Sequence, residues 1–537
     1  MNRADSARKS RNAGTLDPDF AANGLLQPDP TSRGQATSVI RDAQRSHLIF
    51  TCNLPLPHLY RASANGEVDP TFGAGTGYVP VIFVPNRQET AERVLQQPDG
   101  RIVVIGLSHD QPLTFTESAV ARFNVDGRPD PGFGSGGVVV PDIVPEGATP
   151  TGPIHGALQA DGKILISCRY SIFDDPRQLQ VGVLARLNTN GALDRTFGQD
   201  GVVVFRGAFD YELGAVLPQP DGKIVIGTLH HERPSRAMLV RLTGSGEIDR
   251  SFGNNGQAPV ASQEVPGSII LDRQGRLICT GNQFLQTQPG AIVLRFKTDG
   301  SLDPTFNSAR QEGCYWREIA LLPDSRIVAV GRSQSDTSLF ATLKADGALD
   351  QIATGYPGEY RSLAQQPSVP RCVVVGDLSE TPTVFGLRLP TTPLPEDTDF
   401  VDYNWNGWEK GPAAADPRDL VIRHAAGIWY LWNYTHTDDS EGVILHKTFI
   451  LEPGRRYEFA IEVKRYEGRF AVPILSTSAN GATVGAELAV TDLNNWMPLK
   501  GTFTPSVRTV ELAIVSHLAT GRGNDYMIKG LVVRALS

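Results

Sequence analysis

A degenerate motif, Gly-x-Leu-Asp-x-x-Phe, recurs along most of this chain and constrains its fold more than any other feature. Five copies end at Phe72, Phe133, Phe197, Phe252 and Phe306, a shortened copy spans 347–350, and one further copy, 14–20, opens the series. Successive motif aspartates, from Asp17 to Asp350, are 47 to 64 residues apart. Repeats of this length indicate an array in which each unit buries its apolar faces against its neighbours.

A hairpin pattern precedes most copies of the motif. It is clearest at 217–227, where Asp221-Gly222 separates two apolar runs. Asp-Gly tolerates the positive φ angles of a two-residue turn. A third apolar run, such as 183–187, and a fourth, such as 201–205, complete the unit. Each unit is therefore predicted to be a four-stranded antiparallel meander, and about 55 residues is the size of a propeller blade.

The hairpin patterns predict seven blades. The seventh runs from Leu363 to Leu389 and ends without the motif. We expect residues 14–25 to supply the missing strand and so to pair the two ends of the ring. Such closure leaves no edge strand exposed.

The repeats resemble the delta-60 repeat family of bacterial β-propellers. The motif Leu-Asp-x-x-Phe-Gly and the run Gln-Pro-Asp-Gly-Lys-Ile-Val at 219–225 carry this resemblance, which covers 14–389. It implies the propeller fold. It implies no activity, because the family is known mainly as a repeat in large bacterial surface or secreted proteins.

The remaining residues follow a different pattern. Segments 457–463, 510–515 and 526–533 alternate apolar and polar residues, which predicts a β-sandwich. Landmarks at 400–408, 451–457, 495–504 and 524–528 resemble jelly-roll carbohydrate-binding modules. That resemblance implies a carbohydrate or surface glycan as partner. Lys529 stands where such modules usually carry a calcium-supporting Asp, so we expect no cofactor beyond, at most, a structural calcium with Asp525 as candidate ligand.

The predicted fold class is all-β: a seven-bladed β-propeller closed by its N-terminal strand, followed by a C-terminal β-sandwich of jelly-roll type. We expect a flexible tail over 1–13, the propeller over 14–390, a linker over 391–397 and the jelly roll over 398–537.

Composition excludes some classes of function. The formal net charge of −8 argues against a nucleic-acid partner. No apolar run approaches the ~20 residues of a membrane helix, so we expect no membrane insertion. The basic residues within 1–13 precede no apolar stretch, so we expect no secretory signal. The protein is then either cytoplasmic or exported by a non-classical route. The oligomeric state is not predicted.

Aromatic side chains at 429–434 are the densest candidate binding group in the second domain. On a strand, Tyr430, Trp432 and Tyr434 share one face, with Trp429 and Leu431 on the other. We expect the first three to form an exposed, lectin-like platform, because sugars stack on aromatic rings. The alternative is that this row packs the sandwich core. Trp408 and Trp496 are expected to be structural.

Loops at one end of the channel are the candidate site of the propeller. The turn that leaves each second strand is expected to present a polar ring, to which 109–110, 174–175 and 230–232 add further polar groups. The ring either binds a small polar ligand or is a hydrated rim. The candidate ligand-binding residues are Asn53, His109, Arg169, His230, Asn282, Arg332 and Asp377.

No pattern of residues indicates catalysis. Seven equivalent motif aspartates suggest architecture, in which Asp accepts N–H groups of the following turn and Phe fills space between blades. The leading hypothesis is a non-enzymatic binding protein that recognises glycans. The alternatives are a carbohydrate-active enzyme with a catalytic propeller and a targeting jelly roll, and a protein–protein interaction scaffold.

Ring closure yields a first prediction. Deletion of 1–25 is expected to lower the melting temperature by many degrees because it removes the closing strand, whereas deletion of 1–12 is expected to do little. Thermal unfolding of both truncated proteins checks this, and equal effects would refute closure.

Overall fold

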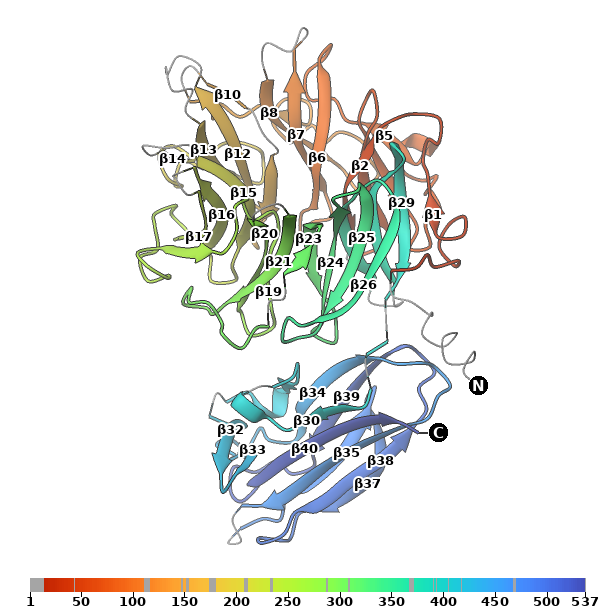
Figure 1. Cartoon of the computed structure of the whole chain (residues 1–537), viewed down its shortest axis with the longest axis vertical. Coiled ribbons are helices and arrows are strands. Elements are labelled where there is room, and N and C mark those ends of the chain that lie inside the picture. The colour runs from red at the N-terminus through yellow and green to blue at the C-terminus, as the bar shows by residue number, and fades with distance from the viewer. Residues whose placement is uncertain are drawn as a thin grey trace. The chain divides into compact units, whose positions relative to one another are not determined.

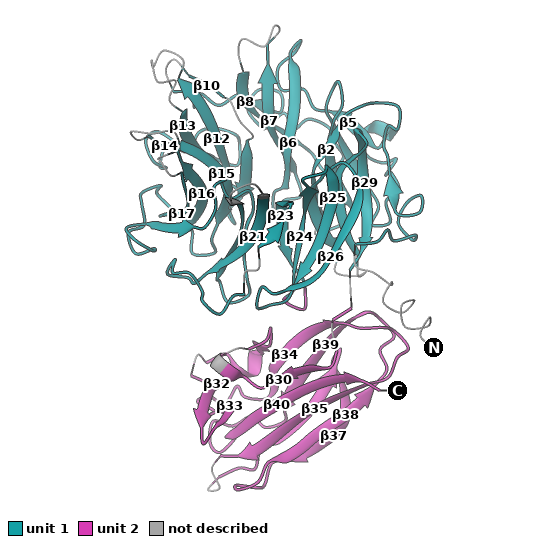
Figure 2. Cartoon of the chain, in the orientation of Figure 1, with its two compact units in different colours: residues 1–322, 326–366, 371–389 teal, residues 323–325, 367–370, 390–537 magenta. Residues whose placement is uncertain are grey.

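The computed structural model describes residues 14–536 except 43, 111–115, 146–147, 151–153, 173–179, 207–210, 232–234, 286–287, 308–309, 367–370, 390, 393, 404, 417 and 467–469. The chain divides into two compact units (Figure 2). The first comprises residues 1–322, 326–366 and 371–389, and the second comprises 323–325, 367–370 and 390–537.

Unit 1 contains seven antiparallel sheets, the blades (Figure 1). Blade 1 contains β2 (Gln35–Arg41), β3 (Leu48–Asn53), β4 (His58–Ala62) and β5 (Tyr78–Pro80). Blade 2 contains β6 (Gln88–Gln96), β7 (Ile102–His109), β8 (Thr116–Phe123) and β9 (Val138–Val139). In blade 3, β10 (Ala148–Pro150) and β11 (His155–Leu158) both pair with β12 (Ile164–Ile172), and β13 (Gln180–Leu187) and β14 (Val202–Phe205) follow.

The next three blades repeat the same four-stranded order. Blade 4 contains β15 (Tyr211–Pro218), β16 (Ile224–His230), β17 (Arg236–Leu242) and β18 (Gln257–Val260). Blade 5 contains β19 (Ile269–Leu271), β20 (Leu277–Leu285), β21 (Gln288–Phe296) and β22 (Gln311–Glu312). Blade 6 contains β23 (Cys314–Leu321), β24 (Ile327–Ser333), β25 (Thr337–Leu343) and β26 (Leu349–Pro357). A short 3-10 helix, η1 (Gly73–Gly75), lies in blade 1.

Blade 7 confirms the predicted ring closure. It contains β27 (Tyr360–Gln366), β28 (Arg371–Leu378) and β29 (Thr381–Arg388), and its outer strand is β1 (Leu25–Leu26) from the start of the chain. Leu25 pairs with Phe385, and Leu16 forms an isolated bridge with Leu387. The first strands of neighbouring blades contact one another around the ring, β27 with β2 included. The two ends of the repeat array therefore share one sheet.

A buried ion pair explains why the motif aspartate recurs. In blade 4, Arg241 on β17 pairs with Asp249 at 2.8 Å. The second carboxylate oxygen accepts the backbone N–H of Ser251 at 3.1 Å, as predicted. Lys223, which follows the hairpin Asp-Gly, reaches the same carboxylate at 3.0 Å. The aspartate thus ties strand 2, strand 3 and the turn before strand 4 together.

The same arginine also links each blade to the next. Its guanidinium lies over the motif phenylalanine of its own blade, and Arg241 Cζ is 4.4 Å from the Phe252 ring centroid. Its Nη1 donates to the Thr298 carbonyl of blade 5 at 2.7 Å. The phenylalanine packs on the following motif glycine: a Cβ at Gly300, where φ is +87°, would lie 2.8 Å from Phe252. We call this arrangement the inter-blade latch. It recurs through Arg61, Arg122, Arg186 and Arg295.

Blades 6 and 7 keep the arginine–aspartate pair of the latch but draw the arginine from a different strand. Thr342 and Gly386 stand where strand 3 carries arginine elsewhere. Arginine at the start of strand 2 then pairs with the aspartate instead, Arg326 with Asp350 at 3.1 Å and Arg371 with Asp17 at 2.7 Å. Arg371 also donates to the Ala64 carbonyl of blade 1 at 3.1 Å. The closing latch therefore joins the last blade to the first.

Unit 2 is a sandwich of two antiparallel sheets, and with the blades it confirms the predicted all-β fold class. One sheet has the order β32 (Val421–Ala425), β33 (Ile428–Asn433), β40 (Tyr526–Ala535), β35 (Tyr457–Arg465) and β38 (Met497–Phe503), with β30 (Glu396–Thr398) also paired to β40. The other has the order β31 (Glu409–Lys410), β34 (Gly442–Ile450), β39 (Thr509–Ser516), β36 (Ile474–Ala479) and β37 (Ala482–Ala489). Two short 3-10 helices are η2 (Val401–Tyr403) and η3 (Pro412–Ala414).

The core of unit 2 lies between its sheets, where Trp408 stacks on Phe459 with ring centroids 5.6 Å apart. One boundary needs correction. Glu396 and Asp397 were expected in a linker, but they pair with Val533 and Val532, because the backbone of β40 offers hydrogen bonds there that a linker would leave unmade. All five cysteines are buried and free. Among the described residues, no helix is long and apolar enough to cross a membrane.

Removal of one latch arginine should destabilise unit 1. Arg241→Met leaves the buried Asp249 carboxylate with Lys223 as its ion-pair partner and removes the bond to the Thr298 carbonyl of blade 5, so the loss should approach but not exceed the about 3–5 kcal/mol of a fully broken buried pair. The midpoint of urea unfolding is expected to fall accordingly. The exposed neighbour Arg250 provides the matched control, Arg250→Met, for which the midpoint should not move. Similar midpoints for both variants would contradict the latch.

The latch also predicts acid sensitivity. Burial alone would raise the pKa of Asp194 and of Asp249, but hydrogen bonds from Thr196 and Lys163, and from Ser251 and Lys223, hold each pKa well below its ordinary value. The unfolded chain therefore takes up protons first as pH falls, and stability present above about pH 4 is lost below it. The melting temperature should fall steeply below pH 4. In Asp249→Asn it should start lower at pH 7 and fall less steeply; an unchanged acid slope would contradict this assignment.

Candidate functional site

Successive side chains of strand β33 point alternately into the core and to the outside of the sandwich. Leu431 is fully buried in the core, and Trp429 packs against that core and stacks on His424 at 4.5 Å. Tyr430 and Trp432 alternate with them and are partly exposed. They lie on the outer side of the sheet, since successive side chains of a strand point to opposite faces.

Five aromatic residues gather on this outer side, which we call the aromatic face: Tyr430, Trp432, Tyr434, Tyr466 and Trp496. The rings of Trp432 and Tyr434 stack at 5.4 Å, and Tyr466 meets Trp432 edge-on at 5.3 Å. Tyr430 and Trp496 lie 6.4 Å apart. The contacts join residues from β33, from the end of β35 and from the start of β38.

Trp432 is a support within this face rather than an open platform. The Arg423 guanidinium lies 3.8 Å from its ring centroid, and its indole Nε1 is buried without a hydrogen-bond partner. The more open rings are Tyr434 and Tyr466, whose side chains are 37% and 46% exposed. Ring faces available to a ligand are therefore displaced from Trp432 toward these two tyrosines.

Cations surround the second tryptophan of the face. The ammonium groups of Lys529 and Lys464 lie 4.6 and 5.3 Å from the Trp496 ring centroid, and Lys529 pairs with Glu462 at 3.1 Å. Sequence reasoning assigned Trp496 a structural role and did not single out Tyr466. The alternation Glu462, Lys464, Tyr466 was the available sign, because these residues share one side of β35 and its extension.

The calcium candidate Asp525 is already engaged within the fold. It is buried, and it accepts the Thr435 backbone N–H at 2.9 Å. A separate group of possible metal ligands consists of Asp416, Asp419 and His436. Arg418 holds Asp416 through two hydrogen bonds, and the His436 ring lies 2.6 Å from Asp419. The Arg418–Asp416 ion pair and the His436–Asp419 hydrogen bond therefore already engage these groups.

Unit 1 encloses a polar cavity of ≈ 630 Å³ in its channel. All seven blades contribute to its wall, through residues of or next to their first two strands. The lining residues that carry charge or hydrogen-bonding groups are Thr37, Glu92, Arg93, His155, Glu212, His231, Gln263, Glu264, Asn282, Trp316, Arg317 and Arg361. A smaller cavity of ≈ 170 Å³ shares Arg93 and His155 with it.

The predicted ring of loop residues lies mostly within strands, which corrects the expectation of a turn. Strands β12 and β20 continue for three residues past Arg169 and Asn282, because ladder pairing extends to their ends. Only Asn282 lines the cavity, and its amide donates to Glu264 at 2.7 Å. Arg169 stands behind the wall, 2.6 Å from Glu212.

The other predicted residues are placed apart from the cavity wall. Arg332 lies 3.5 Å from Glu359, and the side-chain carbonyl oxygen of Asn53 accepts the Ala91 backbone N–H. His109 bonds Thr116, and burial lowers its pKa. Asp377 is buried, and burial raises its pKa.

The two adjacent histidines have different surroundings. His230 is buried against the Tyr211 ring at 4.0 Å, whereas His231 lines the cavity and lies 2.7 Å from Glu212. Residues 174–175 and 232 lie outside the described residues.

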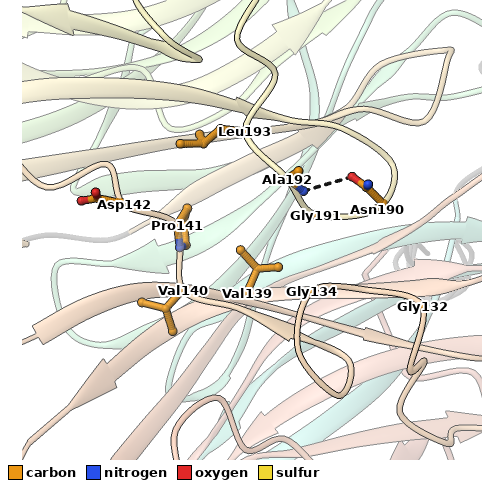
Figure 3. Close-up of a pocket in the computed structure, with 10 residues that line it drawn as sticks. All are labelled: Gly132, Gly134, Val139, Val140, Pro141, Asp142, Asn190, Gly191, Ala192 and Leu193. Carbon is orange, nitrogen blue, oxygen red and sulfur yellow. Dashed lines mark hydrogen bonds between the residues drawn. The ribbon is translucent and has the colours of Figure 1, made fainter.

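A second hollow of ≈ 450 Å³ lies between blades 2 and 3 (Figure 3). Figure 3 shows Val139, Val140 and Pro141 on one side and 190–193 on the other. Its polar side chains are Asp142 and Asn190, and Asn190 is committed to the Ala192 N–H at 3.1 Å. The channel cavity offers far more hydrogen-bonding groups.

Comparison with known proteins agrees with both folds. Residues 97–133, 159–197, 219–252 and 275–306 match a family model described as "Domain of unknown function (DUF5122) beta-propeller". The chain thus carries DUF5122 β-propeller repeats. No curated protein matches the sequence.

Three solved structures are similar to parts of the chain. The EclA C-terminal domain, described as a sugar-binding protein, is 32% identical over 26% of this chain and 100% of its own, with a TM-score of 0.18. The CBM22-1 xylan-binding domain of Paenibacillus barcinonensis Xyn10C is 18% identical over 26% and 94%, with a TM-score of 0.21. Drosophila Semaphorin 1b, domains 1-2, is 8% identical over 68% and 86%, with a TM-score of 0.39. The first two of these structures are described as a sugar-binding protein and a xylan-binding domain, and each covers 26% of this chain.

Proposed function

We propose that this protein binds carbohydrate through the aromatic face of unit 2 and that unit 1 is the scaffold to which this binding module is attached. The observation that carries the proposal is the gathering of five aromatic rings and three cationic side chains on the outer side of one sheet. The described domain with 32% identity to this region is named a sugar-binding protein, which is the ligand class we propose.

The chemistry of the face matches what a sugar offers. The C–H surface of a pyranose packs on an aromatic ring, and its hydroxyl groups need donors and acceptors beside that ring. Tyr434 and Tyr466 provide exposed rings. Lys464, Lys529 and Glu462 provide donors and an acceptor beside Trp496. A cluster of aromatic rings on a solvent-facing sheet would otherwise expose apolar surface without benefit.

Trp432 supports this site indirectly. Arg423 covers one face of its ring, and Tyr434 stacks on it. A ring held in this way loses little conformational freedom when a ligand binds, which favours affinity. The face is therefore a pre-organised surface on which Tyr434 and Tyr466 make the contacts with sugar.

A glycan array probed with the full-length protein tests the proposal. We expect binding to one or more glycans, and a loss of about 5- to 150-fold in affinity for Tyr434→Ala/Tyr466→Ala, since each aromatic ring contributes about 0.5–1.5 kcal/mol. Trp432→Ala should also weaken binding, because it removes the support of Tyr434.

The matched control is Val507→Ala, which removes an exposed apolar side chain in the turn between β38 and β39. It should bind as the parent protein does. Melting temperatures of all variants establish that they are folded. Absence of binding to every glycan on the array, or full binding by the double tyrosine variant, would refute the proposed function.

A further inference from the structure

We propose that the channel cavity of unit 1 is a second ligand site, and that its ligand is a small, uncharged polyhydroxylated molecule of the size of a mono- or disaccharide. The site is separate from the aromatic face and does not depend on the proposed function of unit 2. Its volume of ≈ 630 Å³ lies within the range of about 300–1,000 Å³ typical of small-molecule pockets.

The wall of the cavity carries balanced charge. Three arginines, Arg93, Arg317 and Arg361, face three glutamates, Glu92, Glu212 and Glu264. His155 is held neutral, because burial and the nearby Arg93 lower its pKa to about 3. Counted with the ion-pair partners Glu318, Glu359 and Arg169, the charges around the cavity remain mixed in sign, and no large single-sign patch attracts a charged ligand. The chemistry of the wall therefore selects a ligand by hydrogen bonds.

Most of these charges are already paired within the protein. Arg317 and Arg361 both contact Glu359, the latter at 3.0 Å. Arg93 lies 3.6 Å from Glu318 on the opposite side of the ring. A ligand with a full charge would have to break such pairs, whereas hydroxyl groups can bond to the remaining lone pairs and N–H groups without breaking them.

Glu212 and Glu264, which line the cavity from blades 4 and 5, are likewise paired with other protein groups. Glu212 lies between Arg169 and His231, at 2.6 and 2.7 Å. Glu264 accepts the Asn282 amide, and the Asn282 carbonyl oxygen is itself buried without a partner. The carboxylates are thereby fixed in orientation, and each retains acceptor capacity beyond the bonds it already receives.

Three further groups mark where a ligand would bond. Among the described residues, Glu92 receives no hydrogen bond and forms no ion pair within 4.0 Å, although it lies in the wall near Arg93 and Arg361. The Arg361 Nε and the His155 Nδ1 are buried and lack partners. Buried polar groups are normally hydrogen-bonded, and an exception needs an explanation. One acceptor and several donors in a single cavity fit the hydroxyl group, which both donates and accepts.

The latch explains how the site persists in a repeat fold. Latch residues recur from blade to blade, whereas residues at the channel differ: the seven blades contribute Thr37, Arg93, His155, Glu212, Gln263, Arg317 and Arg361. Different side chains from successive blades make an asymmetric pocket from similar parts. Seven copies of one residue would give a ring of like groups, which could not present donors and acceptors to one small molecule.

Titration calorimetry on the full-length Tyr434→Ala/Tyr466→Ala protein tests this proposal without interference from unit 2. The probes are free glucose, galactose, mannose, xylose, lactose and cellobiose, with glycine betaine as a zwitterion and citrate as an anion. We expect at least one sugar to bind and neither charged probe to compete with it. No binding by any sugar, or binding of betaine or citrate in their place, would overturn the proposal.

Two variants locate the bound sugar. Glu92→Gln keeps the shape of the side chain and converts a charged acceptor into an amide, and Arg361→Met removes donors; each should weaken binding about tenfold or more. Glu247→Gln, at an exposed glutamate of blade 4, is the matched control and should bind unchanged. Melting temperatures check that the variants are folded. Full affinity in both Glu92→Gln and Arg361→Met would place the sugar elsewhere and overturn the channel site.

Discussion

The buried pair of arginine and aspartate in each blade is the interaction on which unit 1 depends. Taking two charges out of water is costly, and the protein offsets that cost by saturating both partners. The Asp249 carboxylate receives Arg241, Lys223 and the Ser251 N–H, while Arg241 also covers Phe252 and reaches the Thr298 carbonyl of the next blade. One arginine thereby secures a blade internally and fastens it to its neighbour.

Because the latch fixes the blades, the channel is free to vary. Where strand 3 lacks the arginine, Arg326 and Arg371 replace it from strand 2, so the aspartate keeps a cationic partner in every blade. The channel shows the opposite pattern, since different blades contribute different polar residues to the cavity wall. A symmetric scaffold with an asymmetric cavity and a sandwich with an aromatic face together give the chain two separate surfaces suited to polar, ring-shaped ligands.

Sequence patterns predicted the architecture more fully than the sites. Alternation predicted that Leu431 would lie on the core side and Tyr430 and Trp432 on the outer side, and the structure places them so. It did not predict that Arg423 would cover Trp432, or that Trp496 and Tyr466 would join the same face. The contacts of Tyr466 and Trp496 with the residues of β33 connect segments far apart in the chain, and no local pattern encodes which strands become neighbours. Candidate residues such as Arg169 and Asn282 were expected in turns but lie within strands, because backbone pairing continues past the last apolar residue of each strand.

The sequence by itself determined the repeat, the blade count, the closing strand and the two folds, because turns, alternation and the spacing of Asp17 to Asp350 are local properties of the chain. Only the tertiary structure decided which polar groups meet. The approach of Glu92 to Arg361 depends on how whole blades pack. The same packing decides which arginine each motif aspartate binds. Packing energy is shared by many residues, so the partner of any one charged side chain is fixed only when all blades are in place.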